Sequence, residues 1–444
     1  MKSSLLILAM LPPFSARALT LQEALEQSDR SSYSGKISRS RLDQRSGQEL
    51  SSLQGMLPTL RAEGGWSATD DPLGAFGTRL RQRSVTMASF DPSALNDPSR
   101  ASGWNAALVA EVPLVNLDAW KGRAAASGAV EAARRRLEAE RIRARSETTR
   151  AYFDAVLAQA AVRTWRGALE AAQAHSNQAA SGNREGTVLR SDLLLSEVRV
   201  GEVEASLAKA QSDSALALRR LSFAMGMPTS AIGSLESFPQ SPALHAAAAA
   251  LPESGKRPEE EAGKADSKAA ELDAARVGAA LLPRLNGITR MDWNASGAPF
   301  SKDPSWTVGI QASWTLHATG EVGDRKAARA RAEEARTLEA MTRAKLDLEE
   351  ASLASGLKLA LQRLDIAETA VAQTAEAHRL TARRYQEGLA TMTETLEAAA
   401  LETSSKLSLE SARHDVVVCL SDLSALRGLG SERLETLTRT ASTR

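Results

Sequence analysis

The chain has 444 residues, with 55 Lys and Arg against 54 Asp and Glu. This balance argues against a nucleic-acid-binding surface, whose basic side chains would dominate the count. Aromatic residues make up only 4% of the chain, and its Ala-, Leu-, Glu- and Arg-rich stretches indicate extended helices rather than a compact enzyme core. The single cysteine, Cys419, excludes an intrachain disulfide and is expected to be a buried apolar side chain.

Residues 1–18 are predicted to be a secretory signal peptide. Lys2 precedes an apolar run from Leu5 to Leu11, and Ala16-Arg17-Ala18 has the small-x-small form of a signal-peptidase site. The apolar run is too short for a transmembrane helix. We therefore expect the mature chain to cross the inner membrane without N-terminal acylation, since no cysteine follows the leader.

A tandem duplication organises the rest of the chain. Positions 104–226 match positions 306–428 at a constant offset of 202 residues, without a gap. This period is too long for a short-repeat solenoid, so each copy is expected to contain strands followed by two long helices. The matched pairs include Trp104/Trp306, Glu131/Glu333, Gly186/Gly388, Asp213/Asp415, Leu221/Leu423 and Gly226/Gly428.

An N-terminal helix over 19–57 is expected to lead into the first of two strand pairs. Segments 58–116 and 284–317 each contain two stretches in which apolar and polar residues alternate, the pattern of a strand. Each stretch is about ten residues long, which a tilted strand needs to cross a membrane. Tryptophans near the strand ends would form an aromatic girdle at the membrane interface. Five of the seven fall in these stretches: Trp66, Trp104, Trp293, Trp306 and Trp314.

Four strands cannot close a barrel by themselves. An open sheet edge in lipid leaves unpaired backbone groups, each of which costs several kcal/mol. Strands that span a membrane must therefore be shared among chains, and three chains would supply twelve strands around a water-filled bore. The alternative is a soluble hairpin whose tryptophans fill a core. The loops at 69–103 and between the last two strands are expected to be solvated.

Pairs of long helices are predicted over 117–238 and 318–430. The helical pattern persists for about 60 residues, roughly 90 Å at 1.5 Å per residue, and apolar residues recur at the heptad-like spacing of coiled coils. Gly186 and Gly388 are predicted to reverse the chain within each pair. Between the repeats, 239–266 is predicted to be a linker with little fixed structure. A helix over 267–283 follows it, and a tail over 431–444 ends the chain.

No pattern of catalytic, cofactor-binding or metal-binding residues occurs in the sequence. The histidines lie far apart and lack Glu or Cys at metal-ligand spacing, and glycine-rich phosphate loops are absent. We therefore predict a protein that is not an enzyme and that has no cofactor and no metal. Its histidines are expected at the surface or between packed helices: His175, His245, His317, His378 and His414.

Taken together, these features resemble the TolC-like outer-membrane efflux protein family, the outer membrane factors. The leader is followed by Leu19-Thr-Leu-Gln-Glu-Ala-Leu25, Pro58 and Pro283 precede the first and third strands, and Arg384-Tyr385-x-x-Gly388 lies at the second turn. The duplicated strand and helix layout and a terminal Leu-x-x-x-x-Gly pattern agree as well. The resemblance covers nearly the whole mature chain.

This resemblance implies a mixed α+β membrane protein in the outer membrane of Gram-negative bacteria. In that family three identical chains form a twelve-stranded barrel in outer-membrane lipid, continued by a periplasmic α-helical coiled-coil tunnel with an equatorial region around it. The implied function is a passive exit channel of a tripartite efflux pump or type I secretion system, docked to a periplasmic adaptor (membrane fusion protein) and an inner-membrane transporter. The residues alone leave a soluble periplasmic coiled-coil adaptor or scaffold as the alternative.

The resemblance also implies a constriction at the periplasmic tip. The family carries acidic residues six and nine positions after the second-repeat glycine, which are Glu394 and Glu397 in this chain. Three chains would form two rings of carboxylates that favour cations. The alternative is a pair of exposed acids that interact with the helix macrodipole.

Links between neighbouring helices hold the tip closed in that family. Asp192 and Tyr385 match two residues of this network. Ala390 stands where the family has an Arg, so the implied network is incomplete. We therefore expect a tip that opens more easily.

Overall fold

A computed structural model describes residues 18–228, 232–252, 256–301, 303–314 and 319–429. The predicted leader, apart from Ala18, and the predicted tail lie outside these residues. Among the described residues no helix combines the length and the apolar composition that crossing a membrane requires. The chain divides into two compact units, which are treated separately below: residues 1–41, 134–262 and 340–444 form the first, and 42–133 and 263–339 form the second.

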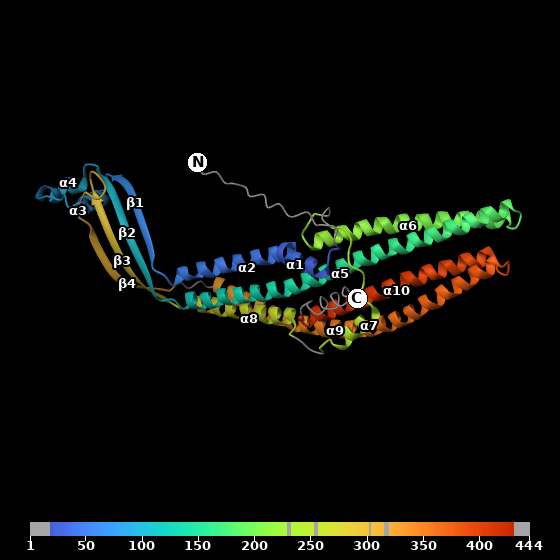
Figure 1. The fold of residues 1–444 in the computed structure, drawn as a ribbon. Helices are drawn as coiled ribbons and strands as arrows, with labels where there is room; N and C mark the ends of the chain where they lie inside the picture. The colour runs from blue at the N-terminus through green and yellow to red at the C-terminus, as the bar shows by residue number, and fades with distance from the viewer. Residues whose placement is uncertain (1–17, 229–231, 253–255, 302, 315–318, 430–444) are drawn as a thin grey trace. The chain divides into compact units, whose positions relative to one another are not determined.

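The second unit contains a four-stranded antiparallel sheet within its described residues (Figure 1). The strands are β1 (Thr59–Thr69), β2 (Ala101–Val115), β3 (Arg284–Ala295) and β4 (Ser305–Ser313), in the order β1-β2-β3-β4. Each strand pairs with its neighbour in sequence, so β1 and β4 form the two edges of the sheet. The predicted extension of the last strand to 317 falls partly on 315–318, outside the described residues.

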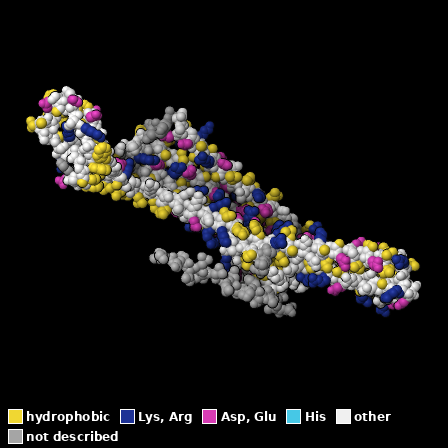
Figure 2. Space-filling view, turned by 90° about the horizontal axis from the view of Figure 1, so that it is seen from above, with side chains coloured by type: hydrophobic (Ala, Val, Ile, Leu, Met, Phe, Trp, Pro, Cys, Tyr) yellow, Lys and Arg dark blue, Asp and Glu magenta, His cyan; other side chains and the backbone are white. Residues whose placement is uncertain are grey.

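The strand register gives this sheet one apolar face. Trp66 lies opposite Trp104, Leu108 lies opposite Met291, and Met291 lies opposite Trp306. Because directly paired residues point to the same side of a sheet, these side chains share a face. Hydrophobic side chains are visible on the surface over the strands in Figure 2.

The opposite face of the sheet carries charged and amide side chains. A guanidinium nitrogen of Arg290 lies 3.7 Å from a Glu63 carboxylate oxygen, and Arg290 Nε donates to Asp292 over 2.9 Å. Arg61 lies 3.6 Å from Glu63 on the edge strand. The two faces therefore differ as the lipid-facing and water-facing sides of a barrel wall do.

The segment between β1 and β2 has more structure than the solvated loop predicted for it. It contains α3 (Pro72–Arg81), the 3-10 turn η2 (Met87–Phe90) and α4 (Pro92–Asn96). Asp71 and Asp91 cap the two α-helices, and each helix begins with a proline, which fits the first turn. The rings of Phe76 and Phe90 pack edge to face at 5.7 Å, so apolar contacts hold the segment together.

The long helices reproduce the tandem duplication. α5 (Leu117–Arg184) and α9 (Gly320–Gln386) have 68 and 67 residues, and α6 (Arg190–Ala224) and α10 (Met392–Leu426) have 35 each. Leu346, Leu357 and Leu364, three of the heptad-like positions of α9, are buried. The helices thus pack as the sequence pattern predicts.

The duplication also extends farther toward the N-terminus than the constant offset suggests. Pro283 lies 225 positions after Pro58, whereas Trp306 lies 202 positions after Trp104. The difference of 23 residues falls between the first two strands, where α3 and α4 are inserted. The strand pair and the helix before it are therefore duplicated as well.

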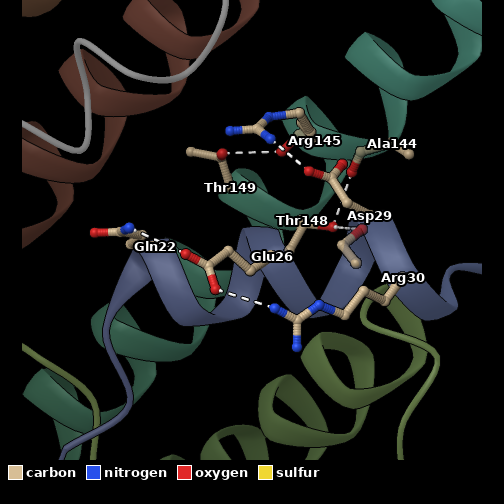
Figure 3. Close-up of polar contacts among 9 residues, drawn as sticks. Gln22, Glu26, Asp29, Arg30, Ala144, Arg145, Thr148 and Thr149 are labelled. Carbon is tan, nitrogen blue, oxygen red and sulfur yellow. Dashed lines mark hydrogen bonds and ion pairs between the residues drawn. The ribbon is translucent and has the colours of Figure 1, made fainter.

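The segments that precede the strands are helical in both repeats. The N-terminal segment forms α1 (Leu21–Ser31), α2 (Tyr33–Ser51) and the 3-10 turn η1 (Ser52–Gly55), interrupted at Ser32. Figure 3 shows α1 against α5, where Arg145 bonds to Asp29 over 2.6 Å. Thr148, also on α5, donates to the carbonyl oxygen of Ala144.

The prediction of little fixed structure over 239–266 is wrong. The described part of this segment contains α7 (Ser241–Ala249) and the start of α8 (Pro258–Ala279). α7 is held by tertiary contacts, since Leu244 is fully buried and His245 lies 2.8 Å from Asp365 on α9. The acidic run 259–261 forms the first turn of α8, where negative charge suits the macrodipole. The helix predicted at 267–283 therefore begins earlier, at Pro258.

The core of the first unit lies midway along α5 and α9, where the ends of α6 and α10 pack against them. Tyr152 and Phe153 of α5 are fully buried, and the Phe153 ring stacks on Phe238 at 5.6 Å. The Tyr152 hydroxyl donates to the carbonyl oxygen of Leu19 over 2.8 Å. Val416 and other apolar residues of α10 complete the cluster, so both repeats and the N-terminus share one core.

Glycines end the second helix of each repeat at a close backbone contact. Gly226 and Gly428 have φ of +65° and +67°, a conformation that glycine adopts without strain. A Cβ on Gly226 would lie 2.2 Å from the Ser31 carbonyl oxygen, and one on Gly428 would lie 1.9 Å from that of Lys256. Both contacts therefore require glycine for space as well as for conformation.

Replacing Gly428 with alanine should destabilise the protein much more than replacing Gly388. Both have positive φ, which costs about 1–2 kcal/mol for alanine, but no atom lies within 4 Å of a Cβ at Gly388. The midpoint of thermal unfolding, followed by circular dichroism, should fall further for Gly428→Ala. Equal shifts in the two variants would contradict the close contact.

Candidate functional site at the helical turns

Both helix pairs reverse direction through the same backbone motif. In the first turn the N–H of Gly186 (φ +75°) donates to the Asn183 carbonyl oxygen over 3.2 Å, and that of Thr187 donates to Gly182 over 2.8 Å. In the second turn the N–H of Gly388 (φ +74°) donates to Tyr385 over 3.0 Å. The next N–H, of Leu389, donates to Arg384 over 2.8 Å. This is the Schellman motif, in which the left-handed residue is usually glycine.

The helices that leave the two turns begin differently. Asp192 and Glu394 are equivalent residues, 202 positions apart, in the first turns of α6 and α10. Thr391 caps α10: its N–H donates to Glu394 Oε2 over 2.7 Å, and the Glu394 N–H donates to its hydroxyl over 3.2 Å. The equivalent residue of α6, Leu189, has no side-chain acceptor. The capping box therefore exists in the second repeat, and Asp192 has no such role.

The capping box favours the ionised form of Glu394. The hydrogen bond from the Thr391 backbone N–H favours the carboxylate form, and together with the Thr391 hydroxyl contact it lowers the pKa of Glu394. Glu394 and Glu397 are exposed, whereas Met392 and Thr395 are buried. The two carboxylates therefore lie on one exposed side of α10. Glu394 interacts favourably with the helix macrodipole and also presents a negative charge to solvent.

Tyr385 and Asp192 lie near each other without a hydrogen bond between them. The Tyr385 hydroxyl is buried and has no hydrogen-bond partner among the described residues. Its burial, followed by the negative charge of Asp192, raises the pKa of Tyr385. Tyr385, near the end of α9, thus lies close to Asp192, in the first turn of α6. Within one chain the two side chains interact only through the negative charge of Asp192. Ala390 contributes no charge to the turn.

The predicted interface tryptophans lie at the surface of the sheet. Trp66, Trp104, Trp306 and Trp314 are between 44% and 74% exposed, and Trp293 is half-buried against Phe300 at 5.5 Å. Trp314 follows β4 and donates to the Leu281 carbonyl oxygen over 3.1 Å. Bulky aromatic side chains at the surface are unusual unless a membrane or a partner covers them.

One cluster escaped the sequence analysis. The rings of His175 on α5 and His378 on α9 lie 5.9 Å apart, and His378 Nδ1 lies 2.5 Å from Glu402 Oε2. Both histidines lie between packed helices, as expected, but their contact with each other was not predicted. The residues stand on different helices far apart in sequence, so no motif signals them. Neither this cluster nor any other group of three His, Cys, Asp or Glu side chains among the described residues has an arrangement that could hold a metal ion.

Removing the Thr391 hydroxyl should destabilise α10. Thr391→Ala opens the capping box, and the loss of an N-cap typically costs about 1 kcal/mol. Thr393→Ala is the matched control, because Thr393 is exposed two residues later, inside α10, and does not cap the helix. Thermal unfolding should shift for Thr391→Ala and not for Thr393→Ala, and the opposite order would contradict the capping role.

A model of the outer membrane efflux protein family matches residues 58–227 and 255–429. The CmeC outer membrane channel of Campylobacter jejuni superposes with a TM-score of 0.77 at 14% identity, over 96% of this chain and 90% of that one. The outer membrane protein VceC of Vibrio cholerae gives 0.75 at 18%, over 92% and 96%. The open-state MtrE outer membrane channel of Neisseria gonorrhoeae gives 0.71 at 17%, over 92% and 89%.

No curated protein matches the chain in sequence. At these low identities the solved structures establish the fold, while the family model covers more than half of the chain. The fold and the family predicted from the sequence are thereby confirmed. The chain therefore belongs to the outer membrane efflux protein family and is an efflux protein of the outer membrane.

Proposed function

We propose that three copies of this chain form a passive exit channel. The observation that carries the proposal is the sheet, which has one apolar face and two open edges, β1 and β4. Three such sheets joined edge to edge close a twelve-stranded barrel and satisfy every edge. The apolar faces would then meet lipid, and the polar face with Arg61, Glu63 and Arg290 would line the bore.

The exposed apolar residues of the long helices support the same assembly. On α9, Leu348, Leu359, Ile366 and Leu380 are between 47% and 73% exposed, and their spacings of 11, 7 and 14 residues place them along one side of the helix. On α6, Leu195, Val198 and Leu216 are about half exposed and form a second stripe. Packing these stripes on neighbouring chains would continue the coiled coil around a tunnel.

Within this assembly the turns of α9 and α10 form the entrance. Three chains would bring three copies of Glu394 and of Glu397 to the tip, as rings of carboxylates that favour cations in a narrow passage. The nearby Asp192 and Tyr385 would restrain the hairpins there, and Gly186 and Gly388 would shape the turns. The five tryptophans of the sheet would form the interfacial girdle.

The energy for export would come from a partner. No catalytic, cofactor or metal role follows from the side chains described above, so we assign the chain a conduit function. A periplasmic adaptor would link its tip to an inner-membrane transporter of a tripartite efflux pump or type I secretion system. Membership of the family supports this assignment over a soluble adaptor or scaffold.

The mass of the detergent-extracted mature protein tests the assembly. Light scattering with the detergent contribution subtracted should give three chains. Ile366→Glu should reduce the proportion of trimer, because it places a charge in the proposed interface between chains. Leu73→Glu is the matched control, since Leu73 is 81% exposed on α3, in the compact unit that does not contain the stripes. A monomer or dimer that needs no detergent would contradict the shared barrel.

Neutralising the proposed rings should weaken cation selectivity. Glu394→Gln keeps an oxygen that can accept the Thr391 hydrogen bond, so the variant isolates the charge from the cap. In planar bilayers with a salt gradient, the reversal potential should shift toward zero for Glu394→Gln combined with Glu397→Gln. The lowered pKa of Glu394 keeps its carboxylate charged as pH falls through the ordinary Glu value of about 4.5. Its contribution to selectivity should therefore persist there and be lost at lower pH. Unchanged selectivity in the double variant would contradict the rings.

A further inference from the structure

A cavity with several basic side chains lies between the halves of the two helix pairs that are nearer the glycine turns, which we call the distal halves. The cavity has a volume of about 440 Å³ and is lined by all four long helices in their described parts. α5 contributes Arg163 and His175, and α6 contributes Arg199. α9 contributes His378, and α10 contributes Glu402 and Lys406. The Glu402 carboxylate is shared, at 2.5 Å from His378 Nδ1 and 2.6 Å from Lys406 Nζ.

The two histidines form a contact between the repeats in charged surroundings. Nδ1 of His378 lies 2.5 Å from a carboxylate oxygen of Glu402, and the other ring nitrogen is Nε2. That nitrogen is buried and has no hydrogen-bond partner among the described residues. The His175 ring lies 5.9 Å away. A proton on His175 would therefore add a positive charge inside a cavity that already contains Arg163, Arg199 and Lys406.

The pH range of this effect follows from His175. Its burial, and then the neighbouring His378, lower the pKa of His175 from the ordinary value of 6.5. Because the packed arrangement favours the neutral ring, its stabilising contribution is complete above about pH 6.5. It is lost progressively as pH falls from that value toward the lowered pKa.

A second histidine joins the same helix pairs nearer to their common core, with the opposite response. His414 Nε2 on α10 lies 2.7 Å from Asp154 on α5, and Nδ1 lies 3.3 Å from Asp415. Burial opposes the charged form, but these two carboxylates outweigh it and raise the pKa of His414. A raised pKa means that this contact is fully stabilising at acid pH and weakens only as pH rises through it.

The positions of the two contacts give acidification a direction. His175 lies 9 residues from the end of α5 at Arg184, whereas Asp154 lies 30 residues from it. His175 and Asp154 are therefore 21 residues apart in α5, which is about 30 Å along the helix at 1.5 Å per residue. Acid therefore weakens the contact nearer the tip and preserves the contact nearer the core.

We propose that the contact between His175 and His378 is a pH-sensitive latch, which joins the two helix pairs of each chain at neutral pH and releases their distal halves in acid. His414 and Asp154 act as the fixed end about which the distal halves separate. The consequence for transport rests on the proposed channel function, because separation at the tip would then widen the entrance.

Distances between the two turns test the latch directly. Thr187 and Leu389 are equivalent exposed residues of the two turns. Both are replaced with spin-labelled cysteine in a Cys419→Ser background, and labelled chains are assembled with an excess of unlabelled chains. Double electron–electron resonance is recorded at pH 7.5 and pH 5.5 on the full-length mature protein in detergent. The distribution should shift to longer distances at pH 5.5.

His175→Gln should abolish this shift, because glutamine retains a polar side chain that does not titrate. His378→Gln is a second variant at the same contact. His245→Gln is the matched control, since it also removes a histidine that bonds to a carboxylate, at Asp365 and outside the cavity, and it should keep the shift. Equal distances at the two pH values would overturn the latch. A shift that survives in His175→Gln and His378→Gln would also overturn the latch. If a variant fails to fold, the distances measured at the two pH values in the protein with all its histidines still test the proposal.

Conductance of the same preparation separates this inference from the proposed function. A conducting trimer without the acid-induced shift would overturn the latch and leave the channel function standing. A protein that shows the shift but forms no trimer and no pores would support the latch and overturn the channel function.

Discussion

The outer edges of β1 and β4, which pair with no further strand among the described residues, are the constraint on which the architecture depends. In the proposed barrel the apolar face of this sheet would lie in lipid, where no water can satisfy the N–H and C=O groups of its edges. The described residues of one chain supply four strands, too few to close a barrel, so in the proposed channel these edges would meet those of other copies. The apolar stripes on α6 and α9 are likewise exposed in a single chain. Packing against the same neighbouring copies would bury them.

The duplication builds this framework twice, and its departures from symmetry are where function would reside. The glycine turns and the helix lengths repeat closely, because backbone geometry and close contacts at Gly226 and Gly428 permit little else. The first turns of α6 and α10 differ: Thr391 supplies a cap that Leu189 cannot. Glu394 is thereby held in a capping box, whereas its counterpart Asp192 acts on Tyr385.

The two helix pairs are joined by different physical means along their length. At the shared core, large apolar side chains such as Tyr152, Phe153 and Leu420 pack together, and burial of this kind is insensitive to pH. Farther along, polar and titratable groups around His175 and His378 take over. Apolar packing joins the pairs at this core, whereas in the proposed latch the contact nearer the turns would depend on the protonation of His175.

The sequence by itself determined the features that arise from local periodicity and backbone conformation. Alternation around Trp104 and Trp306 specified strands, the heptad-like spacing of Leu346 to Leu364 specified long packed helices, and the fixed offset specified the duplication. Other features depend on partners distant in sequence. α7 is held by Leu244 in the shared core and by contacts to α9 more than a hundred residues away, so composition alone suggested a linker. The pairing of His175 with His378 likewise required the folded arrangement, because packing and electrostatics act between neighbours in space, which a local pattern does not encode.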